Sequence, residues 1–471
     1  MVNYSVSDLL TAVLDEGTFQ SWDSRPVAES VLTGEGRVGG RLVALAASDF
    51  SYQGGSIGLV AGERLARAAE RATARGLPLV ALPASGGTRM QEGTAAFLQM
   101  LKVTAAVIAH KAAGLPYLVY LRHPTTGGVL ASWASLGQVT LAEPGALIGF
   151  LGPRACEALA GRPFGPGVQR AENLRAHGLI DAVVEVRDLA SYLARLLAAL
   201  PDRSCPAPDA EPEGQPPVPR ARPAHRSAAA AEGAAIDGWE SVTRTRQPGY
   251  PRGLDFLRAA ATDVAAVGEG GGLLLALARV AGRPVVAGVQ PGEGTFGIVG
   301  LELALRGIRL AADLRLPLVT VIDTPGAELS VAAEEGGIAG WIARCLEALV
   351  TLRVPTVSVL LGRGTGGGAL ALLPADRVLA APHGWLAPLA PEGASAILHR
   401  DATHAPAMAR AQGITAGELA AIGAVDLVAP VGGDPWTGLE AALARELAGL
   451  AAMDPRARLA ARLARLRRLG T

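Results

Sequence analysis

The chain has 471 residues, of which 43 are basic and 43 acidic, so its formal net charge at pH 7 is zero. Half of the residues are hydrophobic and 18% are charged, which excludes a disordered chain and allows large buried cores. The length exceeds that of one compact core and predicts at least two domains. The neutral balance argues against a nucleic-acid-binding protein.

Cysteine and lysine are both scarce. The three cysteines, Cys156, Cys205 and Cys345, are far apart, which excludes a four-cysteine zinc site and a disulfide framework and indicates a reducing, cytoplasmic location. The lysines are Lys102 and Lys111, and neither follows a glycine as a P-loop requires. Any ATP-using step or carrier lysine is therefore expected on another polypeptide.

The sequence shows no targeting or membrane-spanning segment. Acidic residues come early and no basic stretch precedes an apolar run, so no secretory signal is expected. The most apolar stretches are interrupted, for example at His110, Lys111 and Pro116, and we expect no membrane partner.

The organisation along the chain is two similar halves joined by a linker. Residues 201–235 are rich in proline, alanine and charge and lack apolar periodicity, so they predict a linker between domains over 1–200 and 236–471. The Leu-Pro-Leu-Val stretch at 77–80 recurs at 316–319, an offset of 239 residues. The same offset relates other pairs, which indicates a duplicated domain. These pairs are Gly127-Gly128 with Gly366-Gly367, Leu115-Pro116 with Val354-Pro355, and Gly58 with Gly297.

The predicted elements follow the same order in both halves. In the first, a helix over 62–75 leads through Leu-Pro into a strand over 79–83, and a second strand over 117–121 precedes a glycine pair. The second half repeats the order with a helix over 301–314 and strands over 318–322 and 356–360. Strands that alternate with helices predict an α/β fold with mainly parallel sheets. The arginine-rich C-terminus predicts a helix whose Leu459, Leu463 and Leu466 share one face, docked on its own domain or on a partner.

Glycine pairs that follow strands are the strongest local signal for chemistry. At Gly127-Gly128, and again at 366–368, we expect a strand to end, the chain to turn and a helix to begin, so that free backbone N–H groups and the helix dipole form an oxyanion hole. The alternative is that glycine serves only the tight turn. Gly86-Gly87 follows another strand, and the nearby Arg89 and Glu92 are spaced to pair with each other on a helix.

Two other patterns are weaker. Residues 54–58 (GGSIG) match a hydrolase nucleophile elbow, but a triad also needs suitably placed Asp and His. His399, Asp401 and His404 lack the spacing of a zinc-binding helix. The chain therefore offers oxyanion holes made of backbone N–H groups, with no side-chain nucleophile or metal site. Such holes suit a reaction that stabilises the enolate of an acyl thioester.

Long segments of the chain resemble bacterial acetyl-CoA carboxyltransferase. The first half is similar to its β subunit through DFSYQGGSIGLVAGE (49–63), PASGGTRMQEG (83–93) and LPYLVYLRHPTTGGVLASWASLG (115–137). The second half is similar to its α subunit through LPLVTVIDTPGA (316–327) and GRGTGGGALAL (362–372). The order resembles a natural fusion of the two subunits, and the resemblance implies two tandem crotonase-like (spiral) α/β domains related by internal duplication.

The resemblance also implies a reaction, the transfer of a carboxyl group from carboxybiotin to the α-carbon of an acetyl-CoA-type thioester in malonyl-CoA and fatty acid synthesis. Biotin would be carried on a separate protein, with a biotin carboxyl carrier protein, a biotin carboxylase and at least a homodimer as partners. The implied catalytic amides are those of Gly127, Gly128, Gly367, Gly368 and Ala369. The implied CoA-site residues are Gly54, Gly55, Gly86, Gly87 and Arg89, and those of the biotin site are Gly366, Gly367 and Gly368.

The chain departs from the family pattern at several places. It has no cysteines for a zinc ribbon, so no metal is expected. A basic stretch of the α subunit is replaced by residues 290–300, and the second glycine loop carries Arg363 and Thr365 where Glu and Gly are expected. Because of these changes, the sequence does not identify the acyl-CoA substrate, which could be acetyl-CoA or a larger acyl-CoA.

Three other functions remain as alternatives. A biotin-independent malonyl-thioester decarboxylase would use only the first hole. A non-catalytic scaffold would have a blocked hole, for which Arg363 is the residue to inspect. A hydratase or isomerase would need a carboxylate near the thioester, and Glu92 and Glu143 are the candidates from sequence.

Overall fold

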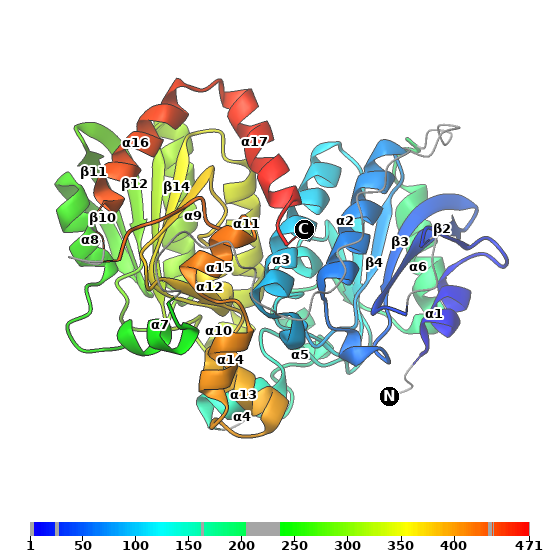
Figure 1. The fold of residues 1–471 in the computed structure, drawn as a ribbon. Helices are drawn as coiled ribbons and strands as arrows, with labels where there is room; N and C mark the ends of the chain where they lie inside the picture. Colours follow the sequence, from blue (N-terminus) through cyan, green and yellow to red (C-terminus); the bar gives the residue numbers. More distant parts are fainter. Residues whose placement is uncertain are drawn as a thin grey trace.

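The structure is a computed structural model that describes residues 4–23, 28–161, 164–203, 236–431, 436 and 438–470. Nearly all of the predicted linker, 204–235, and Cys205 with it, lie outside the described residues. Two sheets account for most of the strands, one in each half of the chain, and Figure 1 shows them side by side.

The first half is built on a seven-stranded sheet in the order β1-β2-β3-β4-β5-β7-β9. Its first three strands are antiparallel and the rest run parallel. The strands are β1 (Gln20–Ser21), β2 (Val31–Val38), β3 (Arg41–Ser48), β4 (Leu79–Leu82), β5 (Tyr117–Leu121), β7 (Val139–Ala142) and β9 (Ala182–Val183), with β6 (Thr125–Thr126) and β8 (Ile148–Gly149) forming a separate pair. The helices are α1 (Val6–Val13), α2 (Leu59–Ala74), α3 (Gly93–Ala112), α4 (Pro153–Ala160), α5 (Ala171–Ala176) and α6 (Val186–Ala198).

The second half repeats this arrangement in an eight-stranded sheet ordered β10-β11-β12-β13-β14-β15-β17, with β16 also paired to β14. The strands are β10 (Thr262–Gly270), β11 (Leu273–Val280), β12 (Arg283–Val289), β13 (Leu318–Thr324), β14 (Thr356–Thr365), β15 (Arg377–Ala380), β16 (Trp385–Ala387) and β17 (Leu427–Val428). The helices are α7 (Gly238–Arg244), α8 (Gly253–Ala260), α9 (Ile298–Leu314), α10 (Val331–Glu335), α11 (Ile338–Thr351), α12 (Gly366–Leu370), α13 (Pro391–His399), α14 (Ala405–Ala411), α15 (Ala416–Ala421), α16 (Leu439–Ala452) and α17 (Pro455–Arg467).

The duplication extends to individual hydrogen bonds. The Ile57 N–H donates to the Gly87 carbonyl at 2.9 Å, and 239 residues later the Phe296 N–H donates to the Gly326 carbonyl at the same distance. The prolines that precede β4 and β13 lie where each strand starts, a position that needs no N–H from them. The predicted α/β class and internal repeat are therefore confirmed.

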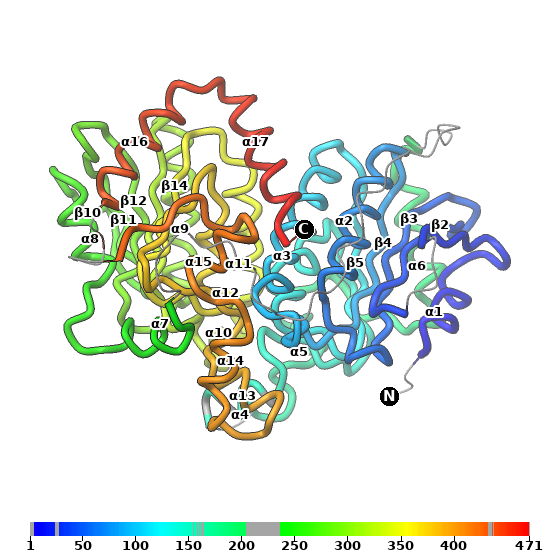
Figure 2. The backbone as a smooth tube through the Cα atoms, in the orientation of Figure 1, coloured from blue at the N-terminus to red at the C-terminus, as the bar shows by residue number. Residues whose placement is uncertain are grey.

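The two halves share one hydrophobic core. A single cluster of buried residues includes members of both sheets, and α3 packs against α11 across the junction. Lys111 on α3 also forms an ion pair with Glu347 on α11 at 2.8 Å. The backbone trace in Figure 2 shows the two halves in contact along this line.

Helix α3 corrects one expectation from sequence. The segment Met90–Ala112 is long and apolar enough to cross a membrane by length and composition, although no such stretch was expected. Yet 89% of that window is buried inside the protein, as in the central helix of a large core. The interruptions at His110 and Lys111 fall only at its last turn.

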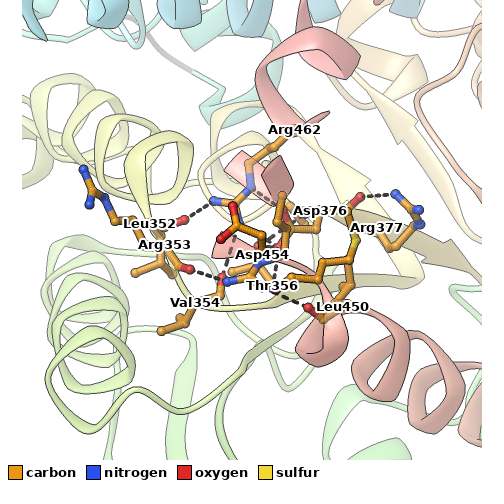
Figure 3. A network of polar contacts seen from close by, with 12 residues as sticks. Leu352, Arg353, Val354, Thr356, Asp376, Arg377, Leu450, Asp454 and Arg462 are labelled. Atoms are coloured by element: carbon orange, nitrogen blue, oxygen red, sulfur yellow. Dashed lines mark hydrogen bonds and ion pairs between the residues drawn. The ribbon is translucent and has the colours of Figure 1, made fainter. Parts of the chain in front are cut away.

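The C-terminal helix α17 crosses from the second half to the first. It packs on α11 and α3, and Figure 1 shows it between the halves, with the C-terminus beside α3. Its buried face matches the predicted leucine face in part: Leu466 is buried, but Leu459 and Leu463 are only partly so, and Arg458 and Arg462 are buried as well. Arg462 donates to both carboxylate oxygens of Asp376 at 2.9 and 2.7 Å, which pairs the buried charge (Figure 3).

Candidate active site

A cavity of about 950 Å³ lies between the two halves, and its lining is mostly apolar. The loops that follow β4 and β5 form one side, and the loops that follow β13 and β14 form the other. Helices α4 and α13 contribute apolar side chains. The glycines that line it are Gly54, Gly86, Gly127 and Gly128 from the first half and Gly326, Gly366 and Gly367 from the second.

In the first half, two backbone amides at this cavity lack acceptors. Ile57 pairs with the loop after β4 in a parallel bridge, which uses the Gly87 carbonyl and the Arg89 N–H. The N–H of Thr88, between them, finds no acceptor among the described residues, and neither does that of Gly128. The two residues are neighbours, because a Cβ on Gly128 would lie 3.2 Å from the Thr88 Oγ1.

The second half repeats this pair. Phe296 bridges to Ala327, with the Gly326 carbonyl and the Glu328 N–H making the hydrogen bonds, so the Ala327 N–H has no acceptor among the described residues. Gly367 is the second residue of α12, and its N–H is one of those that a helix leaves unpaired. Both residues line the cavity. The two halves therefore present equivalent pairs of free donors to one space.

The other predicted catalytic amides are placed differently. Gly127 has the positive φ of 68° that turns the chain, but its N–H donates to the Phe150 carbonyl at 3.0 Å. Gly368 and Ala369 are not lining residues; Gly368 accepts a hydrogen bond from Gln290, and Ala369 is fully buried. Gly128 and Gly367, which occupy equivalent positions 239 residues apart, both line the cavity and have N–H groups without an acceptor among the described residues.

The predicted dipole contribution is wrong for the first glycine pair. No α-helix follows Gly128, only a short 3₁₀ turn over Trp133–Ser135. The reason is Ser132, whose hydroxyl donates to the Gly128 carbonyl and whose φ of −141° leaves the helical range. In the second half, α12 has only five residues. Charge stabilisation at either loop must come from the individual amides.

Of the four predicted CoA-site glycines, two line the cavity and two lie behind it. Gly54 and Gly86 line the cavity, and the Gly86 N–H donates to the Gly54 carbonyl at 2.9 Å. Gly55 and Gly87 are not lining residues. A Cβ on Gly55 would collide with the Ala84 carbonyl, so glycine there allows the two loops to approach.

Arg89 lies outside the cavity lining, contrary to its predicted role in substrate binding. Its guanidinium is buried between Glu29 and Glu92 and also donates to the Ser56 carbonyl at 2.9 Å. Burial alone would lower the pKa of Arg89, but hydrogen bonds from its guanidinium to the carboxylates of Glu29 and Glu92 raise it. The pairing with Glu92 foreseen from the spacing is present, and it anchors the loop that carries Thr88.

The candidate carboxylates and nucleophile are likewise engaged elsewhere. Glu92 accepts from the Leu59 N–H at the start of α2, and Glu143 accepts from the His123 N–H at 2.9 Å. Ser56 lines the cavity, but its hydroxyl is paired with Arg89 and no histidine contacts it among the described residues. Because of these contacts, Ser56, Glu92 and Glu143 do not provide the catalytic side chain that a hydrolase or a hydratase would need.

The histidine cluster on α13 forms no metal site. His404 pairs with Asp401 at 2.9 Å and stacks on His399. Within the described ranges, no group of three or more His, Cys, Asp or Glu side chains could hold a metal ion.

Arg363 does not block the second glycine loop. It lies outside the cavity lining and forms an ion pair at 3.6 Å with the buried Asp323. Asp323 accepts from the Arg363 N–H at 3.0 Å and lies near Arg252. Burial raises the pKa of Asp323, and the two arginines oppose that shift. The departure at Arg363 therefore leaves the loop open.

A partly buried carboxylate connects the second half to the first glycine loop. Glu334 on α10 accepts from the Phe150 N–H at 3.0 Å and from Gln169 at 2.8 Å. Phe150 in turn accepts from Gly127 and packs against the position of Gly367. Burial raises the pKa of Glu334 despite these hydrogen bonds. This chain of contacts fixes both loops relative to each other.

Three residues of the site were missed from sequence: Thr88, Ala327 and Glu328. Thr88 could have been predicted from the alternating direction of N–H groups along an extended loop. The N–H groups of Gly86 and Gly87, just before it, donate to the Gly54 carbonyl and the Ser85 hydroxyl. The 239-residue offset would then have given Ala327.

Residues 11–429 match the family model described as "Carboxyl transferase domain", and the chain belongs to this family. It is 51% identical to a probable biotin-dependent acyl-coenzyme A carboxylase beta3 subunit of Mycobacterium tuberculosis, over 100% of this chain and 99% of that protein. It is 42% identical to the acetyl-coenzyme A carboxylase carboxyl transferase subunits beta/alpha of Salinispora arenicola, over 86% of this chain and 74% of that protein. A crystal structure of transcarboxylase 12S with methylmalonyl-coenzyme A is similar at 23% identity and a TM-score of 0.41, over 96% of this chain and 90% of that one.

The resemblance identified from sequence, to the carboxyltransferase of acetyl-CoA carboxylase, is thereby confirmed at the level of the family.

Proposed function

We propose that this chain is the carboxyltransferase component of a biotin-dependent acyl-CoA carboxylase. The observation that carries the proposal is the pair of equivalent amide sets, Thr88 with Gly128 and Ala327 with Gly367, that face one cavity. Relatives named as acyl-CoA and acetyl-CoA carboxylase subunits support the same activity.

The first amide pair suits the thioester. Loss of the α-proton places negative charge on the thioester oxygen, and the Thr88 and Gly128 N–H groups can stabilise that charge without reorganising. The apolar walls, including Phe97 and Phe150, strengthen these hydrogen bonds by lowering the local dielectric. Gly54 and Gly86 keep side chains out of the approach to this pair.

The second amide pair fits the ureido ring of biotin. Carboxybiotin, when bound, would supply the carboxyl group, and the ring nitrogen released from that group would accept the α-proton. The Ala327 and Gly367 N–H groups would hold the ureido oxygen, and glycine is needed at the second position. A Cβ there would lie 2.9 Å from Ile342 and 3.0 Å from Phe150. The absence of ionisable groups from the first-half lining, within the described residues, leaves no side-chain base beside Gly128.

An acetyl-CoA-type substrate, a separate carrier protein, a biotin carboxylase, a cytoplasmic location and a homodimer or larger assembly complete the proposal. We also propose that the acyl-CoA domain spans 1–200, that the biotin domain spans 236–471, and that biotin binds at 366–368. The alternative is a biotin-independent malonyl-thioester decarboxylase, in which the Ala327 and Gly367 amides would bind no ligand.

The test separates the two amide pairs. In Gly367→Val, the added side chain crowds the second pair, so malonyl-CoA consumption driven by free biotin should fall at least 100-fold while the Kd for malonyl-CoA stays within threefold. Gly340→Ala is the matched control, because a Cβ at this helical glycine meets nothing within 4 Å. Consumption that needs no biotin and survives Gly367→Val would favour the decarboxylase.

A further inference from the structure

One ionisable side chain lines the cavity. Among the described residues of the lining, Glu328 is the only acid and no base accompanies it. It follows Gly326 by two residues, on the loop whose middle amide belongs to Ala327. Its carboxylate therefore lies beside the second amide pair and in the same space.

The contacts of Glu328 leave one carboxylate oxygen available. The Ser330 hydroxyl donates to Oε1 at 2.7 Å, and the backbone N–H of Glu328 is held by the Phe296 carbonyl at 3.1 Å. Oε2 lies near Gly297 and receives no hydrogen bond from any described residue. It is also not among the fully buried unpaired oxygens of the described residues, and Glu328 as a whole is half-buried. A ligand in the cavity can reach this oxygen.

The spatially equivalent carboxylate of the first half is Glu92, which lies beside Gly58 as Glu328 lies beside Gly297. Glu92 is outside the cavity lining, and it accepts from the Leu59 N–H and pairs with Arg89. The position 239 residues earlier is Arg89, whose guanidinium lies between Glu29 and Glu92 and outside the cavity lining. The two copies of the loop thus use the same backbone geometry with different side chains. Among the described lining residues, a carboxylate acceptor occurs only beside Ala327 and Gly367, so the ligand of the second pair should carry a hydrogen-bond donor that the ligand of the first pair lacks.

We propose that Glu328 is a biotin-binding residue, whose carboxylate accepts a ureido N–H while the Ala327 and Gly367 amides hold the ureido oxygen. This inference rests on the proposed function. A ureido ring has an oxygen acceptor flanked by N–H groups, and a thioester has no N–H beside its oxygen. The Ala327 and Gly367 N–H groups match the ureido oxygen, and the adjacent Glu328 carboxylate matches a ureido N–H. A charged acceptor makes a stronger hydrogen bond than a neutral one.

The interaction is tested by equilibrium binding, without any turnover. Biotin methyl ester is titrated into the full chain and followed by calorimetry, with malonyl-CoA binding measured in parallel. Glu328→Leu should raise the Kd for the ester at least tenfold, because a hydrogen bond to a charged group is lost. Glu328→Gln keeps an oxygen acceptor and should raise it less, and both variants should bind malonyl-CoA as the wild type does.

Glu302→Leu, on the exposed face of α9, is the matched control and should change neither Kd. A wild-type chain that binds the ester, with an unchanged Kd in Glu328→Leu, would overturn the role of Glu328 and leave the proposed function standing. A wild-type chain that binds malonyl-CoA but no ester, and consumes malonyl-CoA equally without biotin, would overturn both. Thermal melts of the two variants show whether each is folded, and Glu328→Gln preserves the shape of the side chain.

Discussion

At the scale of single residues, the site depends on backbone groups. The donors are the N–H groups of Thr88, Gly128, Ala327 and Gly367, and glycine is required where a Cβ would enter the space. Side chains act by fixing these groups, as Arg89 does through its carboxylate partners and Glu334 through Phe150. Substitutions at the glycines should therefore alter chemistry more than stability.

Gly128→Ala keeps the backbone N–H and is expected to lower kcat for carboxyl transfer by about 10- to 100-fold, since displacing an oxyanion donor should cost less than removing it, which costs about 100-fold or more. The added Cβ would lie 3.2 Å from the Thr88 Oγ1 and from Met100, close enough to displace the first amide pair. Steady-state kinetics with malonyl-CoA and free biotin measure the effect. Gly417→Ala, where a Cβ meets nothing within 4 Å, is the control, and equal rates for both variants would contradict the assignment.

At the scale of elements, α17 is held by buried arginines. Arg462 donates to Asp376 and to the carbonyls of Leu349 and Leu352 at 2.7 Å, and Arg458 donates to the Leu450 carbonyl (Figure 3). The Asp376 carboxylate also accepts from the Thr356 hydroxyl. The helix is therefore held by one buried polar network, in which the Arg458 Nε lies 3.6 Å from Asp376 without forming a hydrogen bond.

Arg462→Met is expected to destabilise the protein by about 3 kcal/mol, because it leaves the buried Asp376 without its main partner. Urea denaturation measures the loss. The control is Arg456→Met on the exposed side of the same helix, which should change stability by less than about 0.5 kcal/mol. Equal small effects of the two substitutions would show that the network contributes little.

Residue types predicted the location of the elements better than their buried faces. The apolar runs and the Leu-Pro steps at 77–78 and 316–317 gave the strands closely, because a buried parallel strand needs a continuous apolar segment. The predicted leucine face of α17 did not include Arg458 and Arg462, which are buried; a partner from another element, Asp376, makes that burial possible. The free amides of Thr88 and Ala327 also escaped prediction, since they depend on pairing with Ile57 and Phe296.

At the scale of the whole molecule, the two halves are joined around the cavity. Arg467, the last residue of α17, donates to both carboxylate oxygens of Glu63 on α2 at 2.7 Å. Lys102, buried on α3, lies 3.4 Å from the same carboxylate. Burial would raise the pKa of Glu63, but Arg467, Lys102 and Arg67 lower it to about 2.

Glu63→Gln should therefore show a stability loss that depends on pH. Because the pKa of Glu63 is lowered from 4.5 to about 2 on folding, its contribution is full above pH 4.5 and is lost as the pH falls through about 2. Urea midpoints should show a loss on the order of 2 kcal/mol at pH 7 that shrinks steadily between pH 4.5 and pH 2. A loss of constant size across this range would mean that the Glu63 charge does not join the halves.

The central claim is that both amide pairs serve one reaction, and the most direct measurement is the consumption of malonyl-CoA by the purified wild-type chain with and without free biotin. The account predicts release of the decarboxylated acyl-CoA that rises with biotin concentration and saturates. Methylmalonyl-CoA, assayed in the same way, ranks the acyl preference. Turnover of both thioesters at rates that biotin does not change would contradict the claim.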